Sequence, residues 1–158
     1  MIDLLSNEEY LNFVPEDVIY RFSKSFDLPE AEILDIFNET KKFLALYKVG
    51  KIVVTPELGI IDEMWHTFIL FMQQYEEFCV KFFGKVIIHV PTSKKEFLDG
   101  EAKFENSKEE AIEEIMQLQE YMMNLTYDYL GEETLIKWFK TYPKKYYPDA
   151  ILKIRKAF

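Results

Sequence analysis

The chain has 158 residues, of which 49% are apolar and 16% aromatic, and this predicts one well-buried domain over residues 1–158. Its one cysteine excludes an intramolecular disulfide. We find neither a signal-peptide pattern nor an apolar run of about 20 residues, so we expect a cytoplasmic protein without membrane contact.

The first half of the chain has strong signals for helix starts. Ser6-Asn7-Glu8-Glu9 predicts a capping box. Val14-Pro15-Glu16-Asp17 and Leu28-Pro29-Glu30 each place a proline and acidic residues where a first helical turn favours them. The helix that begins near Pro29 is expected to continue to Gly50.

The most regular pattern predicts a fourth helix from residue 56 to residue 83. Apolar residues recur there in steps of three and four and form one stripe, and Gly84 would end the helix. The stripe comprises Leu58, Ile61, Trp65, Phe68, Met72, Tyr75, Cys79 and Phe82.

The second half of the chain predicts three more helices. Residues 86–90 look extended, and residues 93–106 are interpreted as a polar connector. Ser107-Lys108-Glu109-Glu110 predicts a capping box for a helix that ends at Gly131, followed by helices over 132–142 and from Pro148. The expected fold is an all-α, single-domain bundle of about six or seven helices with one short extended segment near 86–90.

Residues 62–89 contain both histidines, the only cysteine and one of the two tryptophans. Asp62 and His66 are four residues apart and therefore neighbours on one helix face, where a carboxylate can orient an imidazole. This pairing suits a metal ligand, a general base or a buried histidine that needs a hydrogen-bond partner. Trp65, Tyr75 and Cys79 lie on the apolar stripe, which favours a role in the core.

Asp62, His66, His89 and Cys79 are candidate ligands for a divalent metal. In an unbroken helix, 13 residues would separate His66 from Cys79 by about 20 Å. His89 follows Gly84 by five residues and should return to Cys79 but not readily to His66. We therefore expect two small clusters, Asp62 with His66 and Cys79 with His89, rather than one shared site.

The sequence D-E-M-W-H at 62–66, with Tyr75, F-C at 78–79, F-G at 83–84 and H-V-P at 89–91, resembles a family motif. It is similar to that of the glycine-rich domain-containing protein-like family, especially its short bacterial members. The resemblance covers about residues 17–140 and implies a fold and a family but no reaction. The chain departs from the motif at Met72, where many members have threonine, and at Phe68 and Val90, where relatives have potential histidine ligands.

Charge is distributed unevenly along the chain. Residues 137–158 carry seven basic residues and one acidic residue, a net charge of +6, whereas the remainder carries −15. A body this acidic disfavours direct nucleic-acid binding. The basic segment 137–158 could form a solvated helix, bind an acidic partner protein or bind the chain's own acidic body.

We weigh three functions on these features. The first is a non-enzymatic protein-interaction module, whose groove between helices receives a partner helix or peptide. The alternative is a small metal-dependent or acid–base enzyme centred on Asp62 and His66, assisted by Glu63 or His89, in which a homodimer could complete the ligand set. The third is an acidic inhibitor or nucleic-acid mimic that uses the Glu-rich helix after Ser107.

Overall fold

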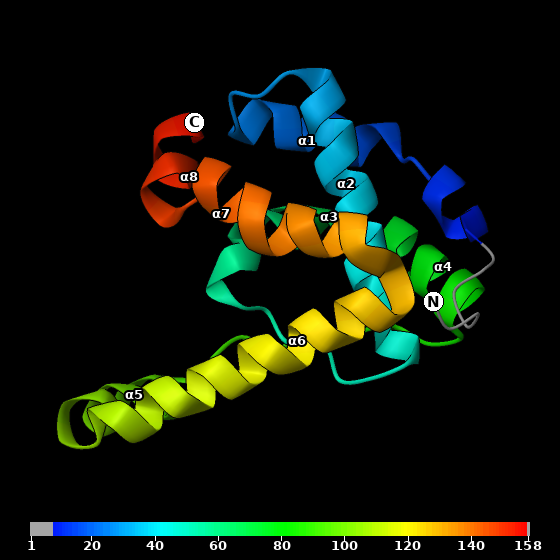
Figure 1. Cartoon of the computed structure of the whole chain (residues 1–158). Helices are drawn as coiled ribbons and strands as arrows, with labels where there is room; N and C mark the ends of the chain where they lie inside the picture. The colour runs from blue at the N-terminus through cyan, green and yellow to red at the C-terminus, as the bar shows by residue number, and fades with distance from the viewer. Residues whose placement is uncertain (1–7, 158) are drawn as a thin grey trace.

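Three helices pack against one another at the centre of the molecule (Figure 1). They are α1 (Glu16–Ser25), α2 (Glu30–Ala45) and α3 (Gly59–Leu70), seen in a computed structural model that describes residues 8–157. Their apolar faces meet in an aromatic core, in which Phe22, Phe37 and Phe68 have no exposed surface. The bulky aromatic composition is thus accommodated where these three helices meet.

The remaining elements surround this centre or project from it. They are η2 (Glu8–Asn12), η3 (Leu46–Lys48), η4 (Pro56–Leu58), α4 (Met72–Phe83), α5 (Lys94–Asn106), α6 (Lys108–Ile136), η5 (Lys137–Thr141), α7 (Tyr142–Lys145) and α8 (Pro148–Ile154). Residues 8–157 contain no strand, and the expected all-α, single-domain fold is confirmed. None of the helices in that range is long and apolar enough to cross a membrane.

Two of the proline-marked helix starts are confirmed. Pro15 and Pro29 are the N-cap residues of α1 and α2, and acidic side chains occupy the first turn of each helix. α2 ends at Ala45, a few residues before the expected end at Gly50, and η3 continues the chain. The capping box expected at Ser6 lies outside the described residues.

The expected unbroken helix over 56–83 is wrong. The chain forms η4, α3 and α4, and Phe71 separates the last two with φ −95° and ψ 61°. Met72, which the stripe placed in the core, is 55% exposed because α4 turns away there and buries Tyr75, Phe78 and Cys79 instead. Neither glycine nor proline marks this break, so tertiary packing imposes it.

The polar connector expected over 93–106 is also wrong, because these residues form α5. Ser93 accepts a hydrogen bond from the Glu96 backbone, and the Glu96 carboxylate accepts one from the Ser93 backbone. The capping box therefore lies at Ser93. Ser107 is the N-cap of α6 but makes no side-chain cap hydrogen bond, and it alone separates α5 from α6.

The predicted helix boundaries near the C-terminus match the structure closely. Gly131 has φ 85° and interrupts the helical backbone of α6 where the sequence predicted an end. The next helical stretch passes through the π-turn of η5 to the end of α7, and Pro148 begins α8 as expected.

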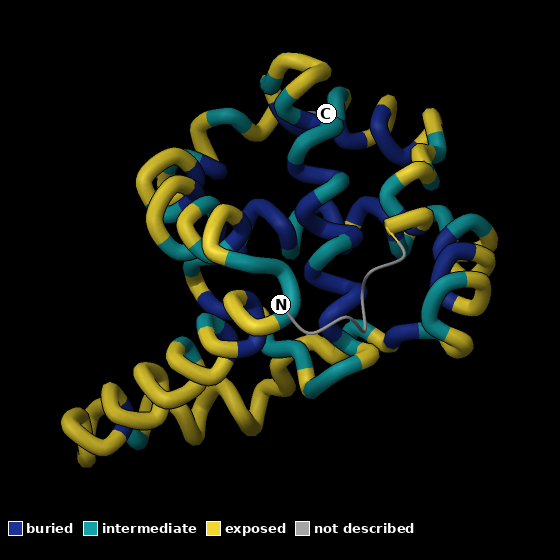
Figure 2. The backbone as a smooth tube through the Cα atoms, turned by 45° about the vertical axis from the view of Figure 1, so that its right-hand side comes forward, coloured by how far each residue is buried: buried dark blue, intermediate teal, exposed yellow. Residues whose placement is uncertain are grey.

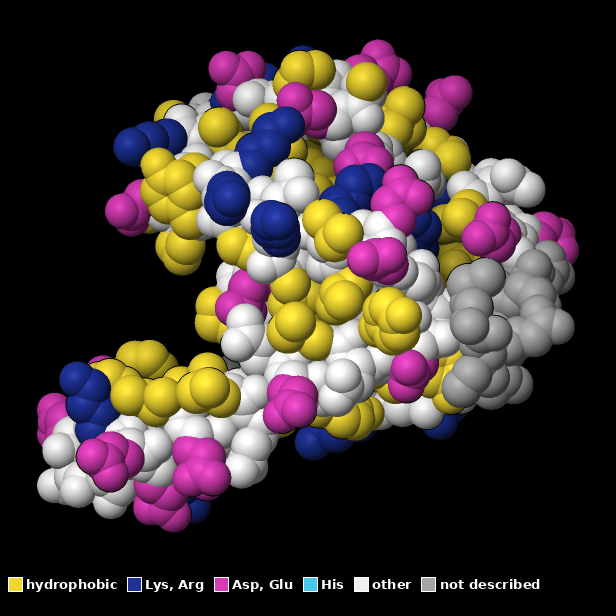
Figure 3. Space-filling model, in the orientation of Figure 1, with side chains coloured by type: hydrophobic (Ala, Val, Ile, Leu, Met, Phe, Trp, Pro, Cys, Tyr) yellow, Lys and Arg dark blue, Asp and Glu magenta, His cyan; other side chains and the backbone are white. Residues whose placement is uncertain are grey.

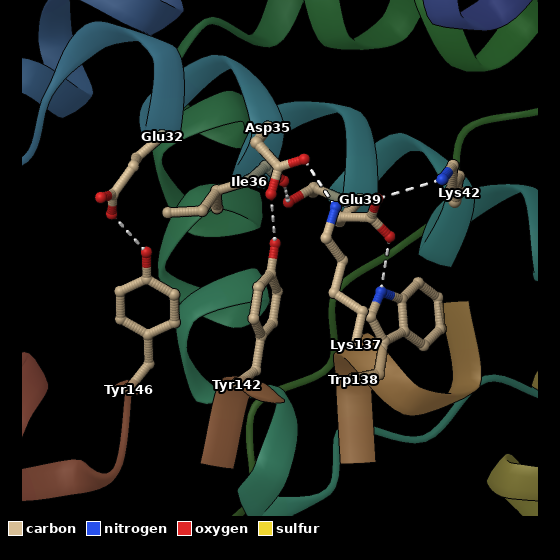
Figure 4. A network of polar contacts seen from close by, with 10 residues as sticks. Glu32, Asp35, Ile36, Glu39, Lys42, Lys137, Trp138, Tyr142 and Tyr146 are labelled. Atoms are coloured by element: carbon tan, nitrogen blue, oxygen red, sulfur yellow. Dashed lines mark hydrogen bonds and ion pairs between the residues drawn. The ribbon is translucent and has the colours of Figure 1, made fainter. Parts of the chain in front are cut away.

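A polar network joins α2 to the end of the chain (Figure 4). The buried Glu39 carboxylate accepts hydrogen bonds from Trp138 Nε1 at 2.7 Å and Lys137 Nζ at 3.0 Å. One and two helical turns earlier, Asp35 accepts from the Tyr142 hydroxyl and Glu32 from the Tyr146 hydroxyl. Each carboxylate of this α2 face thus receives donors from a segment about 100 residues later.

The basic segment 137–158 binds the chain's own acidic body, one of the three alternatives that its composition left open. Its ion pairs are Lys137 with Asp35 and Glu39, Lys145 with Glu32, Arg155 with Glu63, and Lys156 with Asp27. The opposite charges of body and tail therefore act within the chain.

α5 and the first half of α6 form a two-helix arm that extends away from the other helices (Figure 1). Most of its backbone is exposed (Figure 2), and α5 contains no buried residue. Because two short helices bury little surface against each other, large apolar side chains such as Phe97 (59%) and Met116 (61%) stay in contact with solvent.

Replacing Glu39 by alanine tests the α2 network. The substitution leaves the buried Trp138 N–H without an acceptor and removes one carboxylate from Lys137, so we expect unfolding to become easier by about 2–4 kcal/mol. Urea denaturation followed by circular dichroism measures this change. Asp99→Ala, which removes an exposed ion pair with Lys95, is the matched control and should change little; equal losses in both variants would contradict the network's role.

Buried titratable groups predict how stability depends on pH. Burial raises the pKa of Tyr10 to about 12 and raises those of Tyr142 and Tyr146, so the folded state retains phenol protons that the unfolded state loses above about pH 10. Burial lowers the pKa of Lys41 to about 8, where its amine donates to the carbonyls of Leu11 and Phe13, and this favours folding as pH rises. Burial also raises the pKa of the Cys79 thiol, which opposes folding once the unfolded thiol ionises above about pH 8.5. Stability should therefore rise from about pH 8, level off, and fall above about pH 10. The urea midpoint of unfolding, measured from pH 7 to 11 in steps of about half a pH unit, checks this profile. A midpoint that falls monotonically from pH 8 would contradict it.

Candidate metal centre

Asp62, His66 and His89 come together at one end of the broken helix pair. Asp62 and His66 lie one turn apart on α3, and His89 belongs to the segment 85–93, which is neither helix nor strand. One donor atom from each of the three side chains falls within 4.8 Å of the other two. The expectation that His89 could not readily reach His66 is therefore wrong.

The contacts within this cluster are close. His89 Nε2 lies 2.8 Å from Asp62 Oδ1, a hydrogen-bond distance, and His66 Nδ1 lies 3.7 Å from Asp62 Oδ2. The two imidazole ring centroids are 4.5 Å apart. The Asp62 carboxylate thus contacts both histidines of the chain, with Oδ1 facing His89 and Oδ2 facing His66.

The break at Phe71 explains how His89 reaches α3. In a continuous helix, Trp65 and Tyr75 would be about 15 Å apart along the axis. Here Trp65 Nε1 donates to the Tyr75 hydroxyl at 2.9 Å, and that hydroxyl donates to the Ile87 carbonyl at 2.6 Å. This chain of two buried hydrogen bonds fixes the backbone two residues before His89.

Two further features direct the segment back toward α3. Gly84 ends α4 as predicted and has φ 80°, a left-handed conformation that allows the chain to reverse direction. The ring centroids of Trp65 and His89 are 4.2 Å apart, so the indole packs against the imidazole. His89 is only 15% exposed, so its ring is held by Trp65 as well as by Asp62.

Cys79 is buried and lies next to Tyr75 and the Ile87 backbone rather than in the donor cluster. Burial raises the pKa of its thiol, so the protonated form persists at neutral pH. A protonated thiol is a poor metal ligand. The structure therefore places Cys79 in the core, beside the backbone two residues before His89.

Glu63, the further ligand considered from sequence, points elsewhere. Its carboxylate pairs with the Arg155 guanidinium, and its position is about 100° around the helix from Asp62. Among residues 8–157, the group that offers metal donors is Asp62, His66 and His89.

The three donors suit a small divalent cation. Ligand atoms about 2.1 Å from a zinc or iron ion lie roughly 3.0–3.5 Å from one another in tetrahedral or octahedral geometry. The separations of 2.8 Å from His89 Nε2 to Asp62 Oδ1 and 3.7 Å from His66 Nδ1 to Asp62 Oδ2 fall close to this range, and all three donors lie within 4.8 Å of one another. Two imidazoles and one carboxylate also leave coordination positions for water or a substrate.

The sequence identified each residue of this cluster but not their convergence. The missing information was the helix break, because phenylalanine at position 71 is not a residue type that marks the end of a helix. In the structure Met72 is exposed, so the apolar residues form two separate stripes, one on α3 and one on α4. The sequence alone would have indicated the break only if the pattern had been read as two stripes.

Fold and site together define an all-α protein with a two-histidine, one-carboxylate cluster. The family model described as UCP032817-like matches residues 9–119, more than half of the chain, and the chain belongs to this family. That description names no activity. No curated protein and no solved structure matches the chain.

The family match corrects the resemblance to the glycine-rich domain-containing protein-like family, which was wrong. The residues that suggested it have local structural roles. Trp65 and Tyr75 hydrogen-bond across the helix break, and Gly84 reverses the chain.

Replacing Tyr75 by phenylalanine tests the link between the break and the cluster. The variant leaves the Trp65 N–H and the Ile87 carbonyl buried without partners, and we expect a loss of about 2–3 kcal/mol in unfolding free energy. Hydrogen exchange at the amides of residues 86–90 should also become faster. Tyr20→Phe, at an exposed tyrosine, provides the control; unchanged exchange at 86–90 in Tyr75→Phe would show that the hydroxyl does not hold this segment.

Proposed function

We propose that the protein binds one divalent transition-metal ion through Asp62, His66 and His89 and uses it as a Lewis acid. The observation that carries this proposal is the convergence of both histidines on one carboxylate, although 22 residues separate them in the sequence. It follows the enzyme alternative predicted from the sequence, with His89 as a third ligand in place of a ligand from a dimer partner.

The position of His66 supports ligation over a purely structural role. Its side chain is 51% exposed, and its 3.7 Å separation from Asp62 is too long for a hydrogen bond. Among residues 8–157, the one ring that it contacts is that of His89. Hydrogen bonding thus gives little reason for an imidazole here. A cation between the rings gives one, because it would bind His66 Nδ1, His89 Nε2 and a carboxylate oxygen together.

The ligand set indicates which metals to consider. Two histidines with one carboxylate are typical of catalytic zinc and of mononuclear non-haem iron(II). With three protein ligands, either ion retains open positions at which it can polarise a substrate oxygen or lower the pKa of bound water. The exposure of His66 keeps that side accessible to solvent.

The other two functions considered from sequence remain predictions with altered support. The protein-interaction module was favoured partly by the opposite charges of body and tail, which now pair within the chain. Its support lies instead in the exposed apolar arm. The acidic-mimic function relied on the Glu-rich helix after Ser107, where Lys103 already pairs with Glu110 and Glu114.

Metal binding is tested by titrating the metal-free protein with Zn²⁺, Mn²⁺ or, without oxygen, Fe²⁺ in a calorimeter. We expect one ion per chain for zinc or iron. His66→Ala should weaken metal binding by at least about 100-fold, because it removes a direct ligand. Loss of a residue that only hydrogen-bonds to a ligand already weakens metal binding by up to about 100-fold. The exposed position of His66 keeps the variant folded, and circular dichroism verifies this.

Glu63→Gln is the matched control, since it neutralises the neighbouring carboxylate on α3 without touching the cluster. It should leave the metal affinity unchanged, whereas Asp62→Asn and His89→Ala should lower it as His66→Ala does. If the wild type binds none of the three ions, or if His66→Ala binds as tightly as the wild type, the proposal fails.

A further inference from the structure

The arm carries an acidic groove with an apolar floor on one face of α6. Ile112, Met116 and Met123 recur at helical spacing along it, and Glu109, Glu113 and Glu120 line the same groove, which encloses about 750 Å³. Residues 94–121 as a whole contain nine acidic and four basic residues, a net charge of −5. Apolar and acidic side chains alternating on one helix face suit a basic, amphipathic helical surface.

A surface of that kind lies on the same chain, from the last residue of α6 through η5 to α7. Ile136, Lys140 and Lys144 follow one another at intervals of four and line a hollow of about 410 Å³ with Thr141 and Lys145. Ile136 is exposed, and so is Leu152 on α8. In residues 8–157 no ion pair involves Lys140 or Lys144, in contrast to Lys137 and Lys145.

The arm is placed so that another molecule can reach both surfaces. In Figure 3 a row of hydrophobic side chains follows the upper side of the arm and faces an open notch below the body. Basic side chains gather on the body above that notch. The arm leaves the body where Gln119 donates a hydrogen bond to Glu57 of η4, and this contact fixes the inner end of the notch.

We propose that two copies of this chain form a symmetric dimer in which the acidic arm of each copy lies in the notch of the other, against its basic face at Ile136, Lys140 and Lys144. The contact is self-complementary, because every copy carries one acidic–apolar arm and one basic–apolar face, so a two-fold axis satisfies both at once. This pairing covers the apolar side chains of the arm, which the monomer leaves in solvent.

The charges select a second copy as the occupant. Each arm has a net charge of −5 and would contact Lys140 and Lys144 of the other copy, which have no ion pair within residues 8–157 of their own chain. These opposite charges offset the repulsion between the two acidic arms. The dimer supplies a partner for the interaction function predicted from sequence and is independent of the metal proposal.

Analytical ultracentrifugation of the full chain at low salt tests the dimer. At about 100 µM, a dimer with a Kd of about 1 µM contains roughly nine-tenths of the chains, and high salt should shift the distribution toward monomer. Glu113→Lys/Glu120→Lys reverses the arm charge, and Lys140→Glu/Lys144→Glu reverses that of the basic face. Each double variant alone should sediment as a monomer, because both of its contacts place like charges together.

Mixing the two double variants provides the decisive measurement. In a heterodimer, the reversed arm of one copy meets the reversed face of the other, and the two unchanged surfaces meet as in the wild type. The equimolar mixture should therefore regain the dimer that neither variant forms. All four positions are exposed, so circular dichroism should show unaltered folding.

A wild type that stays monomeric at low salt overturns the proposal. So does a dimer that both double variants retain, or a mixture that stays monomeric although the wild type dimerises. The metal content of the same samples is measured separately, so failure of the dimer leaves the test of Asp62, His66 and His89 unaffected.

Discussion

The Tyr75 hydroxyl group holds together α3, α4 and the segment 85–93, and this arrangement positions the cluster of Asp62, His66 and His89. It accepts from the Trp65 indole of α3, belongs to α4 and donates to the Ile87 carbonyl of the returning segment. These contacts exist only because the helix breaks at Phe71, and in turn they compensate the backbone hydrogen bonds that the break removes. The position of His89 beside Asp62 follows directly, since His89 is two residues from the anchored carbonyl.

Local residue chemistry predicted most of the helix boundaries. Prolines at positions 15, 29 and 148 and glycines at positions 84 and 131 act through their own backbone preferences, which one sequence displays. The break at Phe71 has no such signal. It is stabilised by partners 10 or more residues away, so periodicity alone extended the helix through it.

The same distinction applies to the candidate site and to the arm. Asp62 and His66 could be paired from their spacing because both lie within one helical turn. His89 could not be placed, because its position depends on the fold of the whole 71–87 stretch. α5 was missed for a different reason, since it contains no buried residue and the capping pair at Ser93 and Glu96 was its clearest sign.

The network between α2 and the end of the chain also has a consequence during synthesis. Glu39 receives its indole donor from Trp138, 99 residues later, and Glu32 receives its phenol donor from Tyr146, 114 residues later. While the chain is being translated, α2 is made about 100 residues before these donors, and until then Glu39 can accept only from Lys42 of the same helix among its partners in residues 8–157. The acidic face of α2 must stay hydrated until residues 137–146 have been made, so the core should close late, with the long loop-closure entropy that such distant contacts carry.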